Sequence, residues 1–298
     1  FAPGNLVYAN GHKLKNIRAF FAGGGRRVTS SADAGGQVEQ YCFCNECGFA
    51  SREVPNNCPR CQTPITRTAN VAMLASFEAE ENTQITSAED SRQRVIFDRA
   101  EYVLDELAQH ASTYTYDLLS LEYRERSKLL ATNWGRSSRR GAAGEQFLLC
   151  QSCGRHQPAG LTGDKLTKWN DEHARWCNGA VSAFVLGYEF AADVLAVPVP
   201  RAYLPPDSAA EESFVRTLGK ALVVGAQERL EIEPDEIAFM AHKDGASGWT
   251  ISLYETSPGG AGYLRELAPQ LGPWAEAAFR RLFGHECERA CYLCLKSY

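Results

Sequence analysis

The chain has 298 residues, of which 44% are hydrophobic and 10% aromatic, so it can bury the core of one large or two modest domains, and disorder of the whole chain is excluded. Its formal net charge of −5 excludes a protein that coats nucleic acid or membrane through net charge alone, so any anion-binding surface must be local. No segment approaches the roughly 18 apolar residues that a membrane-spanning helix needs, and the first residues lack the features of a signal peptide. A cytoplasmic protein is therefore expected.

The first 40 residues predict a small β-structure. Two alternating runs, LVYA and KLKNIRAFF, flank the dipeptide Asn10-Gly11, which is typical of a tight hairpin turn. The stretch GGGRRVTS that follows lacks the spacing of a phosphate-binding P-loop. A strip of basic residues without acids is a candidate contact for phosphates or simply a solvated face: His12, Lys13, Lys15, Arg18, Arg26 and Arg27.

Residues 41–66 predict a zinc ribbon. Eleven cysteines in a chain without secretion signals indicate metal binding rather than disulfides. Cys44 and Cys47, like Cys58 and Cys61, have two intervening residues, and ten residues separate the two pairs. Two such pairs complete the tetrahedral shell of one zinc ion. Cys42 is an additional thiol, which we interpret as structural.

Residues 67–149 predict a connector of helices and strands with a basic stretch. Ser87, with Asp90 three residues later, favours one or two short helices within residues 85–111, and the Tyr, Thr and Leu alternation of residues 114–135 favours strands. Residues 124–140 hold six bases and one acid, which can lie along phosphates or form a solvated face. The candidate nucleic-acid contacts are Arg124, Arg126, Lys128, Trp134, which could stack on a base, Arg136, Arg139 and Arg140.

Residues 150–298 predict a zinc-binding α/β domain. Cys150 and Cys153 form a pair, and His173 and Cys177 are four residues apart, which places both on one face of a helical turn. Alternatively, His173 is a surface residue and the fourth ligand comes from elsewhere. His156 competes for the imidazole role but is close to the first pair.

From about residue 180 the pattern alternates between strands and helices. Strands are expected over VSAFVLGYEFAADVLAVPVP, EIAFMAH and GWTISLYET, and helices over ESFVRTLGKALVVGAQERLEI, GYLRELAPQL and PWAEAAFRRLF. Gly259, Gly260 and Gly262 stand between a strand and a helix, where free N–H groups could contact a phosphate or where the chain simply turns tightly.

The C-terminus holds a third candidate zinc site. His285, Cys287, Cys291 and Cys294 supply four ligands within ten residues. A redox Cys-x-x-Cys is the rival, but such motifs do not carry an upstream His-x-Cys. We therefore expect about three structural Zn²⁺ ions in an α+β fold: a small β-rich N-terminal part, a ribbon, and a C-terminal mixed α/β domain with two further zinc sites.

No catalytic residues are expected, because zinc sites with four protein ligands leave no position for water. A weaker alternative is a metal-dependent nuclease site formed by Glu189, Asp193 and Glu255, each of which is otherwise an ordinary edge or surface carboxylate.

The segments APGNLVYANG, LLCQSCG with HARWCNG, and YETSPGGAGYL followed by CERACYLCLKSY resemble the zinc-binding C-terminal module of certain bacterial DEAD/DEAH-box helicases, the mitomycin repair factor A-like (MZB) type. Related modules occur in DISARM-type phage-defence proteins. The family's terminal motif commonly reads Cys-x-Cys-x3-Cys-x2-Cys, so His285 stands where the first Cys would be.

The resemblance implies a module that works with an ATP-driven DNA translocase in repair or phage defence. The chain holds no P-loop and no DEAH box, so we expect it to be a fragment whose motor lies upstream of Phe1 or in a partner subunit. The expected partners are single-stranded DNA and the motor domains. The alternative is a protein-interaction scaffold of an anti-phage defence complex that does not touch DNA.

Overall fold

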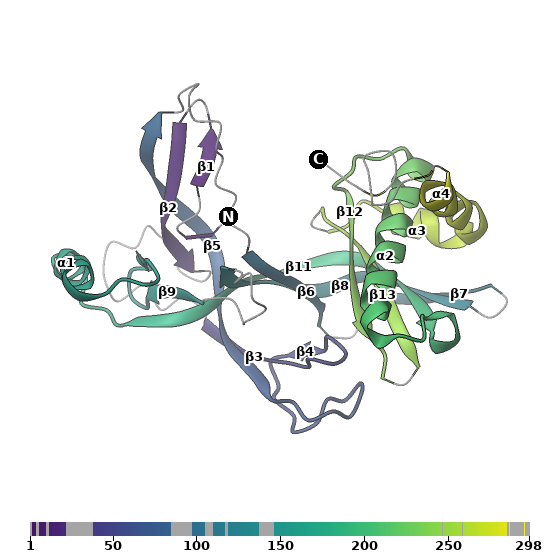
Figure 1. Cartoon of the computed structure of the whole chain (residues 1–298), viewed down its shortest axis with the longest axis horizontal. Coiled ribbons are helices and arrows are strands. Elements are labelled where there is room, and N and C mark those ends of the chain that lie inside the picture. Colours follow the sequence, from purple (N-terminus) through teal and green to yellow (C-terminus); the bar gives the residue numbers. More distant parts are fainter. Residues whose placement is uncertain are drawn as a thin grey trace. The chain divides into compact units, whose positions relative to one another are not determined.

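The computed structural model describes residues 2–3, 6–9, 12–21, 38–84, 97–104, 110–116, 119–136, 146–245, 247–257 and 259–284, with residues 286 and 295. The chain divides into two compact units, each assembled from separate segments (Figure 1). The first unit comprises Phe1–Tyr41, Thr68–Ala100 and Ala131–Glu189, and the second comprises Cys42–Arg67, Glu101–Leu130 and Phe190–Tyr298.

The first unit is built on strands. The expected hairpin forms between β1 (Leu6–Ala9) and β2 (His12–Phe21), and β2 continues antiparallel to β5 (Arg67–Gln84). Strand β5 pairs in parallel with the start of β11 (Val181–Pro200), whose other edge pairs with β9 (Phe147–Cys150). The short β10 (His156–Gln157) closes a hairpin with β9, and helix α1 (Gly163–Ala174) follows. The core between these strands includes Ala72, Phe147, Leu149, Phe184 and Leu186.

The second unit carries the ribbon and the helices. Its strands and helices are β4 (Ala50–Ser51), β7 (His110–Tyr116), β12 (Ile237–Lys243), β13 (Gly248–Glu255), α2 (Ser208–Leu230), α3 (Tyr263–Leu267) and α4 (Leu271–Phe283), with 3-10 turns at Arg201–Tyr203 and Ala268–Gln270. Three further strands have residues in both units: β3 (Val38–Phe43), β6 (Phe97–Val103) and β8 (Leu119–Arg136). The second half of β11 pairs with β13, and β13 pairs with β12, both antiparallel.

Helix α2 packs along the β12–β13 hairpin in this unit, and α4 packs against α2 (Figure 1). Leu195, Ile251 and Leu253 alternate along the strands and are fully buried beneath the helices. Trp274 of α4 is also fully buried, and its indole N–H donates to the Leu222 carbonyl of α2 at 2.8 Å. This bond satisfies the one polar atom that a buried Trp brings into a core.

The mixed helix and strand content expected from the sequence is confirmed, as are the strands and helices predicted after residue 180. The prediction of short helices over residues 85–111 is wrong where the structure describes that stretch, because Phe97–Val103 forms strand β6, which pairs with β8. Pairing with a long neighbouring strand overrides a weak helical pattern. No helix among the described residues is long and apolar enough to cross a membrane.

The units do not follow the consecutive ranges 1–40, 41–66, 67–149 and 150–298 that the sequence suggested. Strands β8 and β11 each begin in one unit and end in the other. The second cysteine cluster therefore belongs to the first unit, while α2, α3 and α4 belong to the second.

The α2–α4 contact predicts the effect of Gly225→Ala. An added Cβ would stand 2.7 Å from the Ala278 backbone nitrogen. Alanine favours a helix over glycine by about 1 kcal/mol, but overpacking costs about 1–3 kcal/mol, so we expect net destabilisation. Gly272→Ala is the matched control, because its Cβ meets no atom within 4 Å. Urea denaturation should show a lower midpoint for Gly225→Ala only; equal midpoints would contradict this packing.

Candidate metal centres

Four cysteines of the second unit converge in the ribbon. The sulfurs of Cys44 and Cys61 are 3.5 Å apart, and those of Cys47 and Cys58 are 3.4 Å apart. All four ligand atoms lie within 4.8 Å of one another. Zinc–sulfur bonds of about 2.3 Å in a tetrahedron require sulfur separations of about 3.8 Å, so this cage fits one zinc ion.

The backbone explains why these thiols converge. The N–H of Gly48 donates to the Cys44 carbonyl at 3.1 Å, and the N–H of Cys44 donates to the Phe49 carbonyl at 2.8 Å. The second pair repeats both bonds through Cys58, Gln62 and Thr63. Gly48 has φ +65° and Gln62 has φ +62°, so each pair closes through a left-handed residue four positions after its first cysteine.

The first unit holds the second cluster, which comprises Cys150, Cys153, His173 and Cys177, all within 4.8 Å of one another. The sulfurs of Cys150 and Cys177 are 3.7 Å apart, and Nε2 of His173 is 3.3 Å from the Cys153 sulfur. The Cys177 N–H donates to the His173 carbonyl, so the end of α1 carries both ligands on one turn, as the four-residue spacing predicts. Three sulfurs and one imidazole are a zinc donor set.

Packing holds His173 in this position. Its side chain is buried and stacks on Trp169, with 4.9 Å between ring centroids. The guanidinium of Arg155 lies 5.8 Å from the Trp169 ring and 3.8 Å from the Glu172 carboxylate. His156 lies outside the cluster and in the lining of a separate pocket.

The Cys150–Cys153 pair repeats the knuckle of the ribbon. Gly154, at φ +70°, donates to the Cys150 carbonyl at 2.9 Å, and the Cys150 N–H donates to the Arg155 carbonyl at 3.0 Å. The Gly154 carbonyl in turn accepts from the Ala19 N–H of β2 at 3.0 Å. The knuckle is therefore joined to a strand more than a hundred residues earlier in the sequence.

The thiols of each cluster differ in acidity. Burial raises the pKa of Cys47, and it raises the pKa of Cys153 to about 12. Burial also acts upward on Cys61, but hydrogen bonds from Thr63 and neighbouring thiols outweigh it and lower the pKa of Cys61 to about 6. Because a thiol with a raised pKa holds its proton until it binds a cation as thiolate, metal binding at either cage releases protons.

The third set, His285, Cys287, Cys291 and Cys294, lies outside the described residues. Cys42 is buried beside the ribbon, where its thiol donates to the Glu53 carbonyl at 3.1 Å rather than joining the cage. This contact agrees with its interpretation as a structural thiol.

The described candidate DNA-contacting residues are divided between the two units. Arg124, Arg126 and Lys128 belong to the second unit and Trp134 and Arg136 to the first, while Arg139 and Arg140 lie outside the described residues. The two guanidinium nitrogens of Arg124 are engaged by Glu122 at 2.9 Å. Trp134 is 7% exposed, so its indole does not present a face to a base, and its stacking role is not supported.

The described residues of the second basic strip all lie on β2 in the first unit. Arg18 pairs with Glu78 at 2.9 Å, and Lys15 is exposed. His12 and Lys13 belong to β2. Arg26 and Arg27 lie outside the part of the chain that the structure describes.

The N–H groups of the glycine turn donate hydrogen bonds to acceptors within the protein. The fully buried Glu255 carboxylate accepts hydrogen bonds from the N–H groups of Ala261, Gly262 and Leu264. Gly260 stands against the Asp193 carboxylate, to which its added Cβ would approach within 3.2 Å. The N–H groups considered for a phosphate are thus used within the protein: that of Gly262 donates to Glu255, and those of Gly259 and Gly260 donate to the carbonyls of Ala191 and Ser257.

The same contacts bear on the nuclease alternative. Asp193 is buried and accepts from the Tyr123 hydroxyl at 2.5 Å and from the Arg126 N–H at 2.9 Å. Glu189, in the first unit, accepts from the Tyr41 hydroxyl at 2.5 Å. Among the described residues, the two thiol clusters are the groups whose ligand atoms converge, and these carboxylates are in neither.

Gly154 provides a test of the second knuckle. In Gly154→Ala the added Cβ would stand 1.9 Å from the Ala19 carbonyl oxygen, and the left-handed φ adds strain. We expect a loss of more than roughly 3 kcal/mol and loss of metal from this cluster. Gly160→Ala, with φ +76° and no atom within 4 Å, should lose only about 1 kcal/mol. Thermal unfolding with a zinc assay measures both, and equal losses would refute the contact with β2.

Comparison with known proteins gives a family match in the second unit. Residues 218–295 match the family model described as MZB, the MrfA Zn-binding domain. Druantia protein DruE of Escherichia coli (strain UMEA 4076-1) is 20% identical over 336 residues, an alignment that covers 100% of this chain and 18% of DruE.

Two solved structures of the DUF1998 helicase MrfA are also similar. The one bound to DNA has a TM-score of 0.41 and 14% identity, covering 68% of this chain and 23% of that chain. The one bound to DNA and AMPPNP has a TM-score of 0.30 and 10% identity, covering 68% and 21%. This chain spans less than a quarter of the length of these relatives. Over residues 218–295 it is similar to the MrfA Zn-binding domain, which confirms the resemblance indicated by its motifs.

Proposed function

We propose that this chain is a zinc-stabilised accessory module of a cytoplasmic DNA helicase or translocase that acts in DNA repair or phage defence. The observation that carries the proposal is the match of residues 218–295 to the MrfA Zn-binding domain. In this role the module supports the motor domains, in the same chain or in a partner subunit, and contacts single-stranded DNA. The sequence of 298 residues holds no P-loop of its own, so ATP hydrolysis belongs to the motor.

The family match supports a third zinc site. Within residues 218–295 the cysteines are Cys287, Cys291 and Cys294, so a zinc ion bound by this segment takes its thiolates from these three. His285 completes the set as an imidazole ligand at the position where the family commonly has cysteine. Three sites of four protein ligands each then account for every cysteine except Cys42.

Closed zinc cages support a structural role for the metal. When bound, zinc supplies folding free energy to the segments that hold its ligands, on the order of 10–16 kcal/mol per site in small zinc peptides. The cages described here offer four protein donors each and leave no position for a reacting water. The chain's own residues would thus position a surface rather than carry out hydrolysis.

Zinc content is the first test. The chain purified under reducing conditions should hold three zinc ions, measured by atomic emission. Cys58→Ser and Cys177→Ser should each lower the count by about one, because each removes a donor from a different cage. Cys42→Ser is the matched control and should keep all three, since its thiol only bonds to Glu53. A count of two would refute the terminal site, and a count unchanged by Cys58→Ser would refute the ribbon site.

DNA binding is the second test. The affinity for a fluorescent oligo-dT should fall with rising salt, because phosphate contacts release counterions. Replacing Arg136, Arg139 and Arg140 by Ala should lower the slope of log K against log salt by about 2, at about 0.7 per contact on a single strand. The control replaces Lys165, Lys168 and Arg175, exposed bases of α1 and its end, and should leave the slope unchanged. An affinity indifferent to salt would exclude the DNA contact and favour the scaffold alternative.

A further inference from the structure

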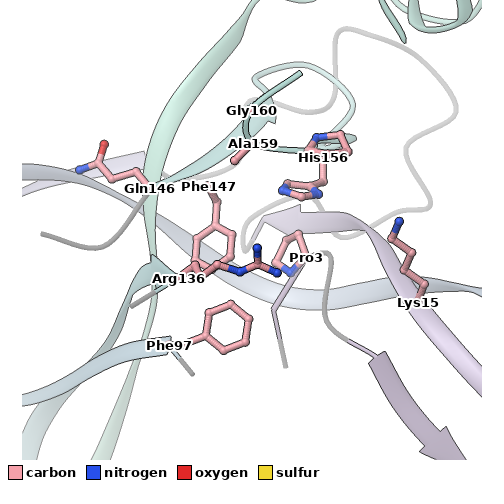
Figure 2. A pocket seen from close by; sticks show the side chains of 10 residues that line it. Pro3, Lys15, Phe97, Arg136, Gln146, Phe147, His156, Ala159 and Gly160 are labelled. Atoms are coloured by element: carbon pink, nitrogen blue, oxygen red, sulfur yellow. The ribbon is translucent and has the colours of Figure 1, made fainter. Parts of the chain in front are cut away.

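The first unit contains a pocket that neither zinc cage uses. Its volume is about 420 Å³, which lies within the range of about 300–1,000 Å³ that holds small organic ligands and is too large for a lone inorganic anion. Strands that are distant in the sequence line this pocket (Figure 2). Strand β2 supplies Lys15, β6 supplies Phe97, the end of β8 supplies Arg136, and the β9–β10 hairpin supplies Phe147 and His156.

One side of the pocket is aromatic. Phe97 and Phe147 have ring centroids 5.9 Å apart, and His156 meets the edge of Phe147 at 6.5 Å. Phe147 is buried and anchors this wall in the core, whereas Phe97 is half-buried and keeps part of its ring accessible. A planar apolar group gains both area burial and ring–ring contact on such a wall.

Two basic side chains also line the pocket. In Figure 2 the side chains of Lys15 and Arg136 reach the pocket from different strands, and none of the ten lining residues is acidic. Glu80 stands opposite Lys15 in the β2–β5 register, yet no ion pair joins the two, and Arg136 has no carboxylate partner among the described residues. Arg18, by contrast, pairs with Glu78 on the same two strands. Two cations and no acid in the lining of one pocket form a site for an anion.

His156 adds a polar group that stays neutral. Burial, with a smaller contribution from the Lys15 charge, lowers its pKa to about 4. A neutral imidazole offers one N–H donor and one acceptor nitrogen, the pattern needed at the polar edge of a nucleobase. The pocket therefore combines a ring-stacking wall, a neutral polar edge and two cations.

We propose that this pocket binds one nucleoside monophosphate unit, with the phosphate between Lys15 and Arg136 and the base against Phe97 and Phe147. The unit can belong to a DNA strand or be a free nucleotide. If the unit belongs to a DNA strand, the proposal rests on the proposed function, because a strand held by an accessory module would present such a unit to the pocket. If the unit is a free nucleotide, the proposal stands apart from that function. Base stacking on a protein ring tolerates any base, so the site would hold a strand without reading its sequence.

The test measures binding of three probes to the 298-residue chain: oligo-dT, dTMP and inorganic phosphate. Lys15→Ala combined with Arg136→Ala should weaken binding of the nucleotide probe by roughly tenfold or more, because two charged contacts are lost. Phe97→Leu keeps the charges and most of the apolar volume but removes the ring, and it should weaken binding by about fivefold. The matched control, Lys165→Ala combined with Lys168→Ala, removes two exposed charges from α1 and should bind as the unmodified chain does.

The outcomes separate the sources and the two proposals. Pocket-dependent binding of oligo-dT but not of dTMP assigns the unit to a strand, whereas pocket-dependent binding of dTMP alone assigns a free nucleotide and removes DNA binding from the proposed function. Affinities for both oligo-dT and dTMP that are unchanged in the Lys15 and Arg136 variant overturn the pocket proposal and leave the proposed function intact. Inorganic phosphate competing as well as dTMP overturns the nucleotide assignment. Unchanged zinc content and melting temperature show that each variant is folded.

Discussion

The two described cages depend on a backbone that turns through the left-handed region four residues after the first cysteine of each of their Cys-x-x-Cys pairs. At this turn the N–H and C=O of the first cysteine are both bonded within the knuckle. Gly48 and Gly154 adopt it without strain, whereas Gln62 adopts it at φ +62° with a cost of about 1 kcal/mol. That cost is small beside the roughly 10 kcal/mol or more that a bound zinc ion contributes.

At the two knuckles that carry glycine, the left-handed residue also stands close to a remote strand. A Cβ added to Gly48 would stand 3.1 Å from the His242 Cβ of β12, and a Cβ added to Gly154 would stand 1.9 Å from the Ala19 carbonyl oxygen of β2. Glycine at these two positions therefore adopts the left-handed conformation and also leaves space for the neighbouring strand. Because each cage closes a loop of modest length, 17 residues from Cys44 to Cys61 and 27 from Cys150 to Cys177, it also fixes the strand contact that its knuckle makes.

These local rules explain which features the sequence could predict. Ligand spacing identified both described clusters, including His173, because the geometry of a knuckle and of a helical turn is set within a few residues. The strands and helices after residue 180 followed from their hydrophobic periodicity. The Cys-x-x-Cys-Gly pattern shared by Gly48 and Gly154 carried a further signal, the left-handed turn at the fourth position, but not which strand it would touch.

Features that depend on tertiary pairing were not predictable in the same way. Phe97–Val103 has a mixed polar and apolar pattern that suits a helix, and only the presence of β8 beside it makes it a strand. The glycine turn after β13 offered amide donors, as expected, but their acceptor is Glu255 at the end of the preceding strand. Trp134 was expected to face a ligand, yet the packing of its unit buries it.

The distribution of buried acids explains how a chain with a net charge of −5 can hold a cationic pocket. Glu255 accepts hydrogen bonds from three amides and Asp193 from Tyr123 and an amide, while Glu211 pairs with Arg201 and accepts from Trp249, so these carboxylates bond within their own unit. Arg18 pairs with Glu78, whereas Lys15 and Arg136 line the pocket. Local placement of charge, rather than the net charge of the chain, therefore determines where an anion can bind.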